Sequence, residues 1–135
     1  MFKNILVPHD GSDYSQKAIG MAVGIAKLTG AAISILQVLP APFPASSVPL
    51  AGDTGAPEIT PEIEAAKKLI DNDVKVTYRI RRGEPANVIL QTVIDDGNDL
   101  VVMGSRGITG FSGLLLGSVS SKVVQLSKAP VLLAK

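Results

Sequence analysis

The sequence predicts an α/β fold, a three-layer sandwich in which helices cover both faces of a five-stranded parallel sheet. Two observations support this prediction. Short apolar runs alternate with amphipathic stretches along the chain, as strands joined by crossover helices do. Most of these runs are apolar almost without interruption, which is typical of strands covered on both faces. The length of 135 residues suits one domain, which we expect to span residues 1–135.

The elements follow from these runs and from the residues that flank them. Ser12 or Asp13 is a candidate cap for the first helix, and Gly30 stands where that helix is expected to end. The expected elements, in chain order, are a strand at 3–8, a helix at 15–28, a strand at 31–39, a short helix at 62–70, a strand at 74–82, a helix between Pro85 and Gly97, a strand at 100–103, a helix at 117–127 and a strand at 130–134.

The third strand differs from the others and indicates the strand order. Its apolar residues alternate with polar ones, so it is expected at an edge of the sheet with one wet face. The wet face would carry Lys75, Thr77, Arg79 and Arg81. An order of 3-2-1-4-5 fits this pattern and puts a topological switch point between strands 1 and 4, where parallel sheets bind ligands at their carboxyl ends.

Residues 40–61 form a long connection before the short second helix. This segment holds six of the nine prolines of the chain. Segments of this length without secondary structure are either functional lids or passive connectors. Both interpretations stay open.

A glycine-rich stretch follows the fourth strand, at the expected switch point. Gly104, Gly107, Gly117 and Ser118 give the spacing G-x2-G-x9-G-S, which is neither a Walker P-loop nor the dinucleotide G-x-G-x-x-G. Glycine lets a ligand approach the backbone N–H groups, and a helix that begins near Gly117 favours an anion. The alternative is a flexible connector, but the position in the fold favours a phosphate site.

Composition argues against several other classes of protein. Thirteen basic and twelve acidic residues, with only five aromatic ones, disfavour a nucleic-acid platform. The chain has no cysteine and one histidine, so no metal site is expected from protein side chains alone. No membrane span and no signal peptide are apparent, and we expect a cytoplasmic protein.

Several segments together resemble the universal stress protein family in its single-domain form. They are the opening Ile5-Leu-Val-Pro-His-Asp-Gly-Ser12, the Gly-Glu-Pro at 83–85, the strand and loop Asp99-Leu-Val-Val-Met-Gly-Ser-Arg-Gly107, and the ending Pro130-Val-Leu-Leu133. The complete glycine signature resembles the ATP-binding branch of the family. The resemblance implies a Rossmann-like fold, similar to the adenine nucleotide alpha hydrolases, with the same strand order.

The resemblance also implies a site for ATP, ADP or AMP, with Mg²⁺ on the phosphates. Asp10 would contact the ribose, and Arg106 would either contact a phosphate or point to water. Pro8 would only shape the end of the first strand, while the backbone around Val38 and Met103 would line the adenine. The implied nucleotide-binding residues are Pro8, His9, Asp10, Val38, Met103, Gly104, Arg106, Gly107, Gly117, Ser118, Val119 and Ser120.

Two residues depart from the family pattern. His9 stands where relatives often have a small or β-branched residue, so the ribose side is either crowded or able to titrate. Gln37 stands where a histidine is frequent in the second strand and retains only polarity.

Three functions are compatible with these observations. The first is a stress-response regulator that binds an adenine nucleotide and acts on an unidentified protein partner. The second is a slow ATPase or an adenylyl or phosphoryl transferase, although no spacing compels a catalytic assignment and at most weak ATP hydrolysis is expected. The third is a scaffold that needs no nucleotide. The resemblance further implies a homodimer that forms through the fifth strand, Val131, Leu132 and Leu133.

Overall fold

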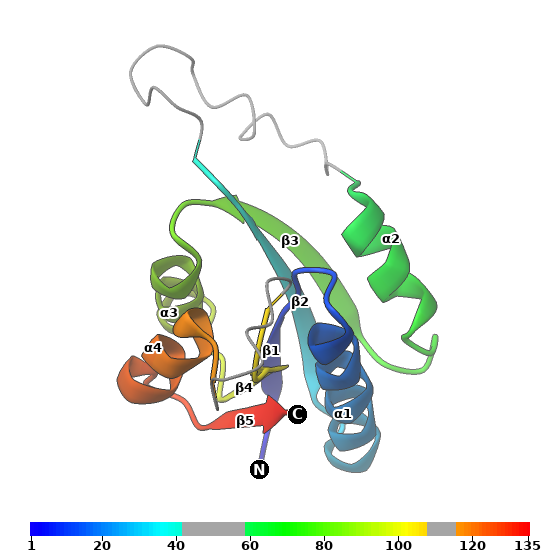
Figure 1. Cartoon of the computed structure of the whole chain (residues 1–135). Helices are drawn as coiled ribbons and strands as arrows, with labels where there is room; N and C mark the ends of the chain where they lie inside the picture. Colours follow the sequence, from blue (N-terminus) through cyan, green and yellow to red (C-terminus); the bar gives the residue numbers. More distant parts are fainter. Residues whose placement is uncertain (42–58, 108–115) are drawn as a thin grey trace.

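The computed structural model describes residues 1–41, 59–107 and 116–135, which form a parallel sheet flanked by helices (Figure 1). Every element expected from the sequence is present, with bounds that differ by only a few residues. The elements are β1 (Asn4–Pro8), α1 (Asp13–Thr29), β2 (Ala32–Leu39), α2 (Pro61–Lys68), β3 (Val76–Arg82), α3 (Pro85–Asp95), β4 (Leu100–Gly104), α4 (Ser118–Leu126) and β5 (Val131–Ala134).

The sheet has the order β3-β2-β1-β4-β5, and all neighbouring strands are parallel. The predicted α/β class and the predicted strand order are therefore confirmed. β1 pairs with both β2 and β4, so the loops that follow β1 and β4 leave the same edge of the sheet side by side. This is the switch point at which the sequence places its glycine-rich stretch.

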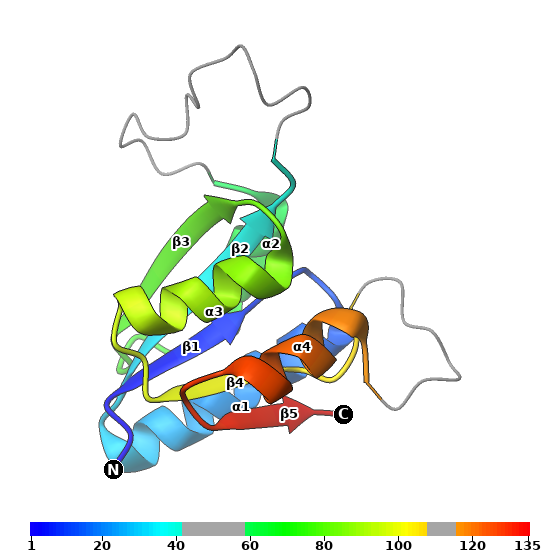
Figure 2. The same ribbon diagram turned by 90° about the vertical axis from the view of Figure 1, so that its left-hand side faces the viewer.

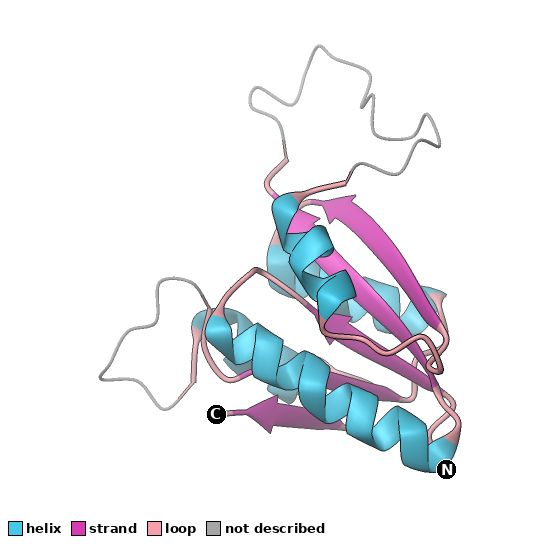
Figure 3. Cartoon of the chain, turned by 90° about the vertical axis from the view of Figure 1, so that its right-hand side faces the viewer, coloured by secondary structure: helices cyan, strands magenta, loops and turns pink. Residues whose placement is uncertain are grey.

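The helices form two layers, one on each face of the sheet. α1 and α2 cover one face (Figure 3), and α3 and α4 cover the other (Figure 2). None of the helices formed by the described residues is long and apolar enough to cross a membrane.

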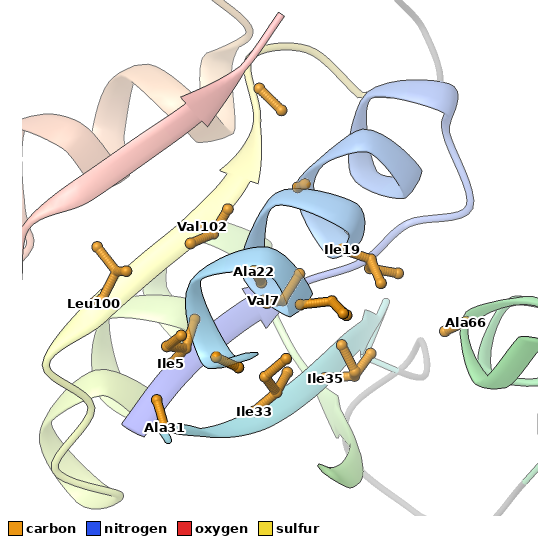
Figure 4. Packing of buried hydrophobic residues seen from close by; sticks show 14 of the residues in the cluster. Ile5, Val7, Ile19, Ala22, Ala31, Ile33, Ile35, Ala66, Leu100 and Val102 are labelled. Atoms are coloured by element: carbon orange, nitrogen blue, oxygen red, sulfur yellow. The ribbon is translucent and has the colours of Figure 1, made fainter. Parts of the chain in front are cut away.

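Consecutive residues of the central strands alternate between the two layers. Ile5 and Val7 of β1 pack with Ala22 of α1 (Figure 4), whereas Leu6 faces the layer of α3 and α4. All three strand residues are fully buried. This explains the uninterrupted apolar run in the sequence, because each residue meets a helix whichever way it points.

The helix ends refine two expectations. Ser12 caps α1 by accepting a hydrogen bond from the Ser15 N–H, so Asp13 is the first helical residue and not the cap. Gly30 ends α1 as expected, with a φ of 75°, in the left-handed region that favours glycine.

The face of β3 that was expected to be wet is partly covered. Arg79 forms an ion pair with Asp96, the residue that follows α3, and Arg81 forms one with Asp95, the last residue of α3. Both arginines are half-buried. The expected wet face is confirmed at Lys75 and Thr77, which are exposed, but not at the two arginines, because periodicity does not reveal acidic partners on another element. α2 is short, as predicted, while the proposed lid or connector at 40–61 lies mostly outside the described residues.

Candidate functional site

A cavity of about 270 Å³ lies at the carboxyl ends of β1, β2 and β4. Each residue that the sequence analysis assigned to nucleotide binding lines it, together with four others. The lining residues are Pro8, His9, Asp10, Ser15, Leu36, Val38, Pro85, Ile89, Met103, Gly104, Arg106, Gly107, Gly117, Ser118, Val119 and Ser120. Elements distant in the sequence thus meet at the predicted edge of the sheet.

One part of the cavity is apolar. Leu36 and Val38 come from β2, Ile89 from α3 and Met103 from β4. Such a surface suits a flat, weakly polar ring. The sequence analysis missed Leu36, Pro85, Ile89 and Ser15 as lining residues. Leu36 and Pro85 had detectable signals, the end of an apolar strand and the Gly-Glu-Pro segment, but Ile89 looks like any other apolar helix residue.

Asp10 and Gly107 lie against one another in this cavity. One Asp10 carboxylate oxygen, Oδ1, accepts a hydrogen bond from the Ser12 N–H at 2.9 Å. A Cβ added at Gly107 would lie 2.9 Å from the other oxygen, Oδ2. Only glycine therefore lets the carboxylate stay in this position without a shift.

The other two glycines of the signature have different local roles. A Cβ at Gly104 would lie 2.7 Å from the Tyr14 Cβ, so glycine lets β4 pack closely against α1. A Cβ at Gly117 would meet only ordinary contacts, the nearest being the Arg106 Cα at 3.4 Å. The Gly117 N–H donates to the Ser105 carbonyl at 2.7 Å, which fixes the start of α4 beside the end of β4.

The first turn of α4 presents backbone N–H groups to the cavity. Ser118, Val119 and Ser120 occupy the first helical positions, whose N–H groups have no carbonyl partner within their own helix. The Ser120 hydroxyl donates to the Gly104 carbonyl at 2.9 Å, so this hydroxyl holds α4 against the end of β4. Backbone groups and the Ser118 hydroxyl remain the suitable donors for an anion.

Arg106 lies beside Tyr14 of α1. Its guanidinium Nη1 is 3.5 Å from the Tyr14 hydroxyl, and its central carbon lies 6.0 Å from the centre of the ring. The side chain is half-buried at the rim of the cavity. The two expectations for Arg106, a contact with a phosphate and a side chain that points to water, both stay predictions.

His9 is buried, with 2% of its surface exposed. Its Nε2 lies 3.0 Å from the Glu62 carbonyl, so Nε2 carries the proton of the neutral ring. The Ser15 hydroxyl lies 2.8 Å from Nδ1 and 2.9 Å from the Ser12 carbonyl, and its single proton is donated to one of these two acceptors at a time. Burial lowers the pKa of His9 below its ordinary value of 6.5, although the Glu62 carbonyl and the Asp10 carboxylate oppose this. The ring is thus held against α1 and α2.

The Gln37 side chain also bonds to the start of α2. Its side-chain amide donates to the Glu62 carboxylate at 3.2 Å and accepts from the Thr60 hydroxyl. Gln37 does not line the cavity. The polarity predicted for this position therefore has a structural partner at the start of α2.

The sequence profile of the Universal stress protein family matches residues 1–135. The chain belongs to this family. Among curated members, the universal stress protein YxiE of Bacillus subtilis is 39% identical over 149 residues, with both chains covered completely. The resemblance found in the sequence is thus confirmed over the whole chain.

Solved structures of other universal stress proteins share the fold. The protein MJ0577 of Methanocaldococcus jannaschii superposes with a TM-score of 0.79 at 24% identity, covering 100% of this chain and 96% of its own. A universal stress protein solved in complex with cAMP has a TM-score of 0.74 at 25% identity, covering 99% and 97%. The family assignment and the fold therefore agree.

Proposed function

We propose that this universal stress protein binds an adenine nucleotide in the cavity at the ends of β1 and β4 and that nucleotide occupancy regulates its action in the stress response. The observation that carries the proposal is the meeting of the residues of the glycine signature with Asp10 in one cavity. A regulatory effect requires that the nucleotide prefers one conformation of the protein.

The chemistry of the cavity matches the parts of a nucleotide. Adenine suits the apolar part formed by Val38, Ile89 and Met103. Asp10 suits the ribose hydroxyl donors, and the N–H groups of Gly107 and of the first turn of α4 suit phosphate oxygens. The relative solved with cAMP supports an adenine nucleotide as the ligand class. ATP, ADP and AMP differ only in the phosphates that extend toward the glycine stretch.

The site favours binding over catalysis. The single histidine already has both ring nitrogens engaged, with Ser15 and with the Glu62 carbonyl, so it is poorly placed to act as a general base. Asp13 is exposed in the first turn of α1. We assign Mg²⁺, where ATP brings it, to the phosphate oxygens. Weak ATP hydrolysis and a cytoplasmic location stay predictions.

The test begins with purification without added nucleotide, acid release and chromatography of any bound small molecule. Calorimetric titration of AMP and of ATP with Mg²⁺ into the emptied protein follows. Gly107→Ala is expected to weaken binding about tenfold, because its Cβ displaces the Asp10 carboxylate oxygen from its position. Gly24→Ala is the matched control, since a Cβ at Gly24 in α1 meets nothing within 4 Å. No binding heat in the parent would overturn the proposal.

We also propose that the chain forms a homodimer through β5. This strand lies at the edge of the sheet, and Val131, Leu132 and Leu133 are only half-buried. An apolar edge strand can pair with a second copy. Light scattering on a sizing column at micromolar concentration is expected to give twice the chain mass, and a monomer would contradict this proposal.

A further inference from the structure

Polar side chains fasten the N-terminus of α2 to the carboxyl ends of β1 and β2. His9 contacts the Glu62 carbonyl and the Ser15 hydroxyl, at 3.0 and 2.8 Å. Gln37 contacts the Glu62 carboxylate and the Thr60 hydroxyl, and Thr60 in turn caps α2 by accepting from the Ile63 N–H. We call His9, Ser15, Gln37, Thr60 and Glu62 the α2 clamp.

The α2 clamp encloses the loop that carries Asp10. His9 precedes Asp10 directly, and Ser15 lies in the first turn of the helix that follows it. Glu62 touches this loop as well, because a Cβ at Gly11 would lie 3.0 Å from the Glu62 Cγ. Gly11 has a φ of 86°, so the chain turns sharply beneath α2. Contacts from α2 therefore fall on both neighbours of Asp10.

The central members of the α2 clamp link the position of α2 to the position of the loop that carries Asp10. His9, Ser15 and Gln37 are 2%, 3% and 6% exposed, so water has little access to their hydrogen bonds. In such an environment, removing one partner costs a buried hydrogen bond. The Ser15 hydroxyl also lies 2.9 Å from the Ser12 carbonyl, so it stays bonded to the start of α1 when His9 is replaced. The His9 ring, its bonds to Ser15 and Glu62, and the backbone at Asp10 are thus held as one unit.

We infer that His9 is a positioning residue, which through the α2 clamp holds the Asp10 loop in its binding geometry and so couples nucleotide affinity to the docking of α2. The inference rests on the proposed function. If docked α2 favours the nucleotide, then the nucleotide must favour docked α2 by the same factor, because coupling between two equilibria is reciprocal.

Hydrogen exchange of the ligand-free protein gives the first test. His9→Leu is expected to speed exchange at the Ile63 and Glu64 amides of α2 and also at the Ser12 amide, which donates to Asp10. Lys68→Ala is the control, because this side chain is exposed on α2 and outside the clamp. If only the α2 amides respond to His9→Leu, the inference is overturned, whatever the parent binds.

Binding gives the second test. His9→Leu is expected to weaken AMP binding about tenfold, as the loss of a buried hydrogen bond does. His9→Gln, which retains an N–H donor for the Glu62 carbonyl, is expected to recover most of the affinity. AMP is further expected to slow exchange at the Ile63 and Glu64 amides in the parent but not in His9→Leu. A merely structural role for His9 would lower stability and leave this last effect intact.

The outcomes separate the two proposals. A parent that binds neither AMP nor ATP overturns the proposed function, while the exchange of the Ser12 amide still decides whether His9 couples α2 to the Asp10 loop. A folded His9→Leu protein with the affinity of the parent overturns the inference alone. If His9→Leu does not fold, Gln37→Met releases the same helix from β2 with little change in volume and is expected to give the same effects at smaller size.

Discussion

Two regions of different construction border Asp10. On one side, the glycine signature supplies backbone N–H groups and close contacts that only a missing Cβ permits, as at Gly107. On the other side, the α2 clamp consists of side chains from five separate positions. The first region is visible in the sequence, and the second is not. A backbone site leaves a fixed spacing of glycines, whereas a side-chain network leaves ordinary residues whose partners lie far along the chain.

The largest expected effect is that of Gly117→Val on the backbone side. The substitution places methyl groups next to the Gly107 N–H, which lies 3.8 Å from a Cβ at this position. Affinity for AMP should fall about a hundredfold, which corresponds to about 2.8 kcal/mol, roughly the value of one hydrogen bond to a charged phosphate oxygen. The fold should survive, since the nearest Cβ contacts are ordinary. Calorimetry with circular dichroism checks both points, and parent-like binding would mean that the site is misplaced.

Substitution of Asp10, which lies between the two regions, is expected to cause the next largest loss of nucleotide affinity. Asp10→Ala should weaken nucleotide binding by roughly 1–3 kcal/mol, through the lost acceptor for a ribose hydroxyl. It also removes the acceptor of the Ser12 N–H. Asp10→Asn retains an oxygen for Ser12 and separates the two roles. Titration calorimetry on both variants measures the difference, and equal affinities for Ala, Asn and the parent would exclude Asp10 from the site.

Gly104→Ala distinguishes packing from binding within the glycine signature. Its Cβ would lie 2.7 Å from the Tyr14 Cβ and 3.0 Å from the Tyr14 backbone, so β4 and α1 must move apart. We expect a loss of about 1–2 kcal/mol in the free energy of unfolding, as for an overpacked core. Urea titration of the variant and the parent measures it. Unchanged stability would indicate that this contact relaxes freely.

The smallest expected effect is a decrease in stability at low pH that is caused by His9 of the α2 clamp. Burial holds the pKa of His9 below 6.5, so the unfolded chain binds a proton first as the pH falls. The stability that neutral His9 contributes is complete above pH 6.5 and declines as the pH falls from 6.5 toward the lowered pKa. Urea titrations across this window should show the decline in the parent and not in His9→Gln.

Glu62 does not interfere with this measurement. Its own N–H and the Gln37 amide hold the pKa of the Glu62 carboxyl below 4.5. The contribution of a carboxylate with a lowered pKa is present above 4.5 and is lost only as the pH falls further. A stability change between pH 6.5 and 5 that persists in His9→Gln would therefore assign the titration to a group other than His9.

The fold could be predicted almost entirely from local patterns. Apolar runs such as Leu100 to Met103 identify strands because their faces are both covered, and the alternation in β3 identifies an edge. Caps such as Gly30 mark helix ends because few residues accept a positive φ. Partners across elements could not be predicted in this way. The ion pairs of Arg79 and Arg81 with the acidic end of α3 have no signal in periodicity.

The α/β class, the strand order and the family can be recognised from the sequence, as can twelve of the residues that line the cavity. The fold class and the strand order depend on short-range rules such as the period of apolar residues, whereas most of the cavity residues were implied by the resemblance to a known family. The folded structure was needed to show that Gly104 serves packing while Gly107 makes room for Asp10, that Ile89 completes the apolar part of the cavity, and that His9 faces α2. A side chain acquires its hydrogen-bond partner and its burial only when distant segments are brought together.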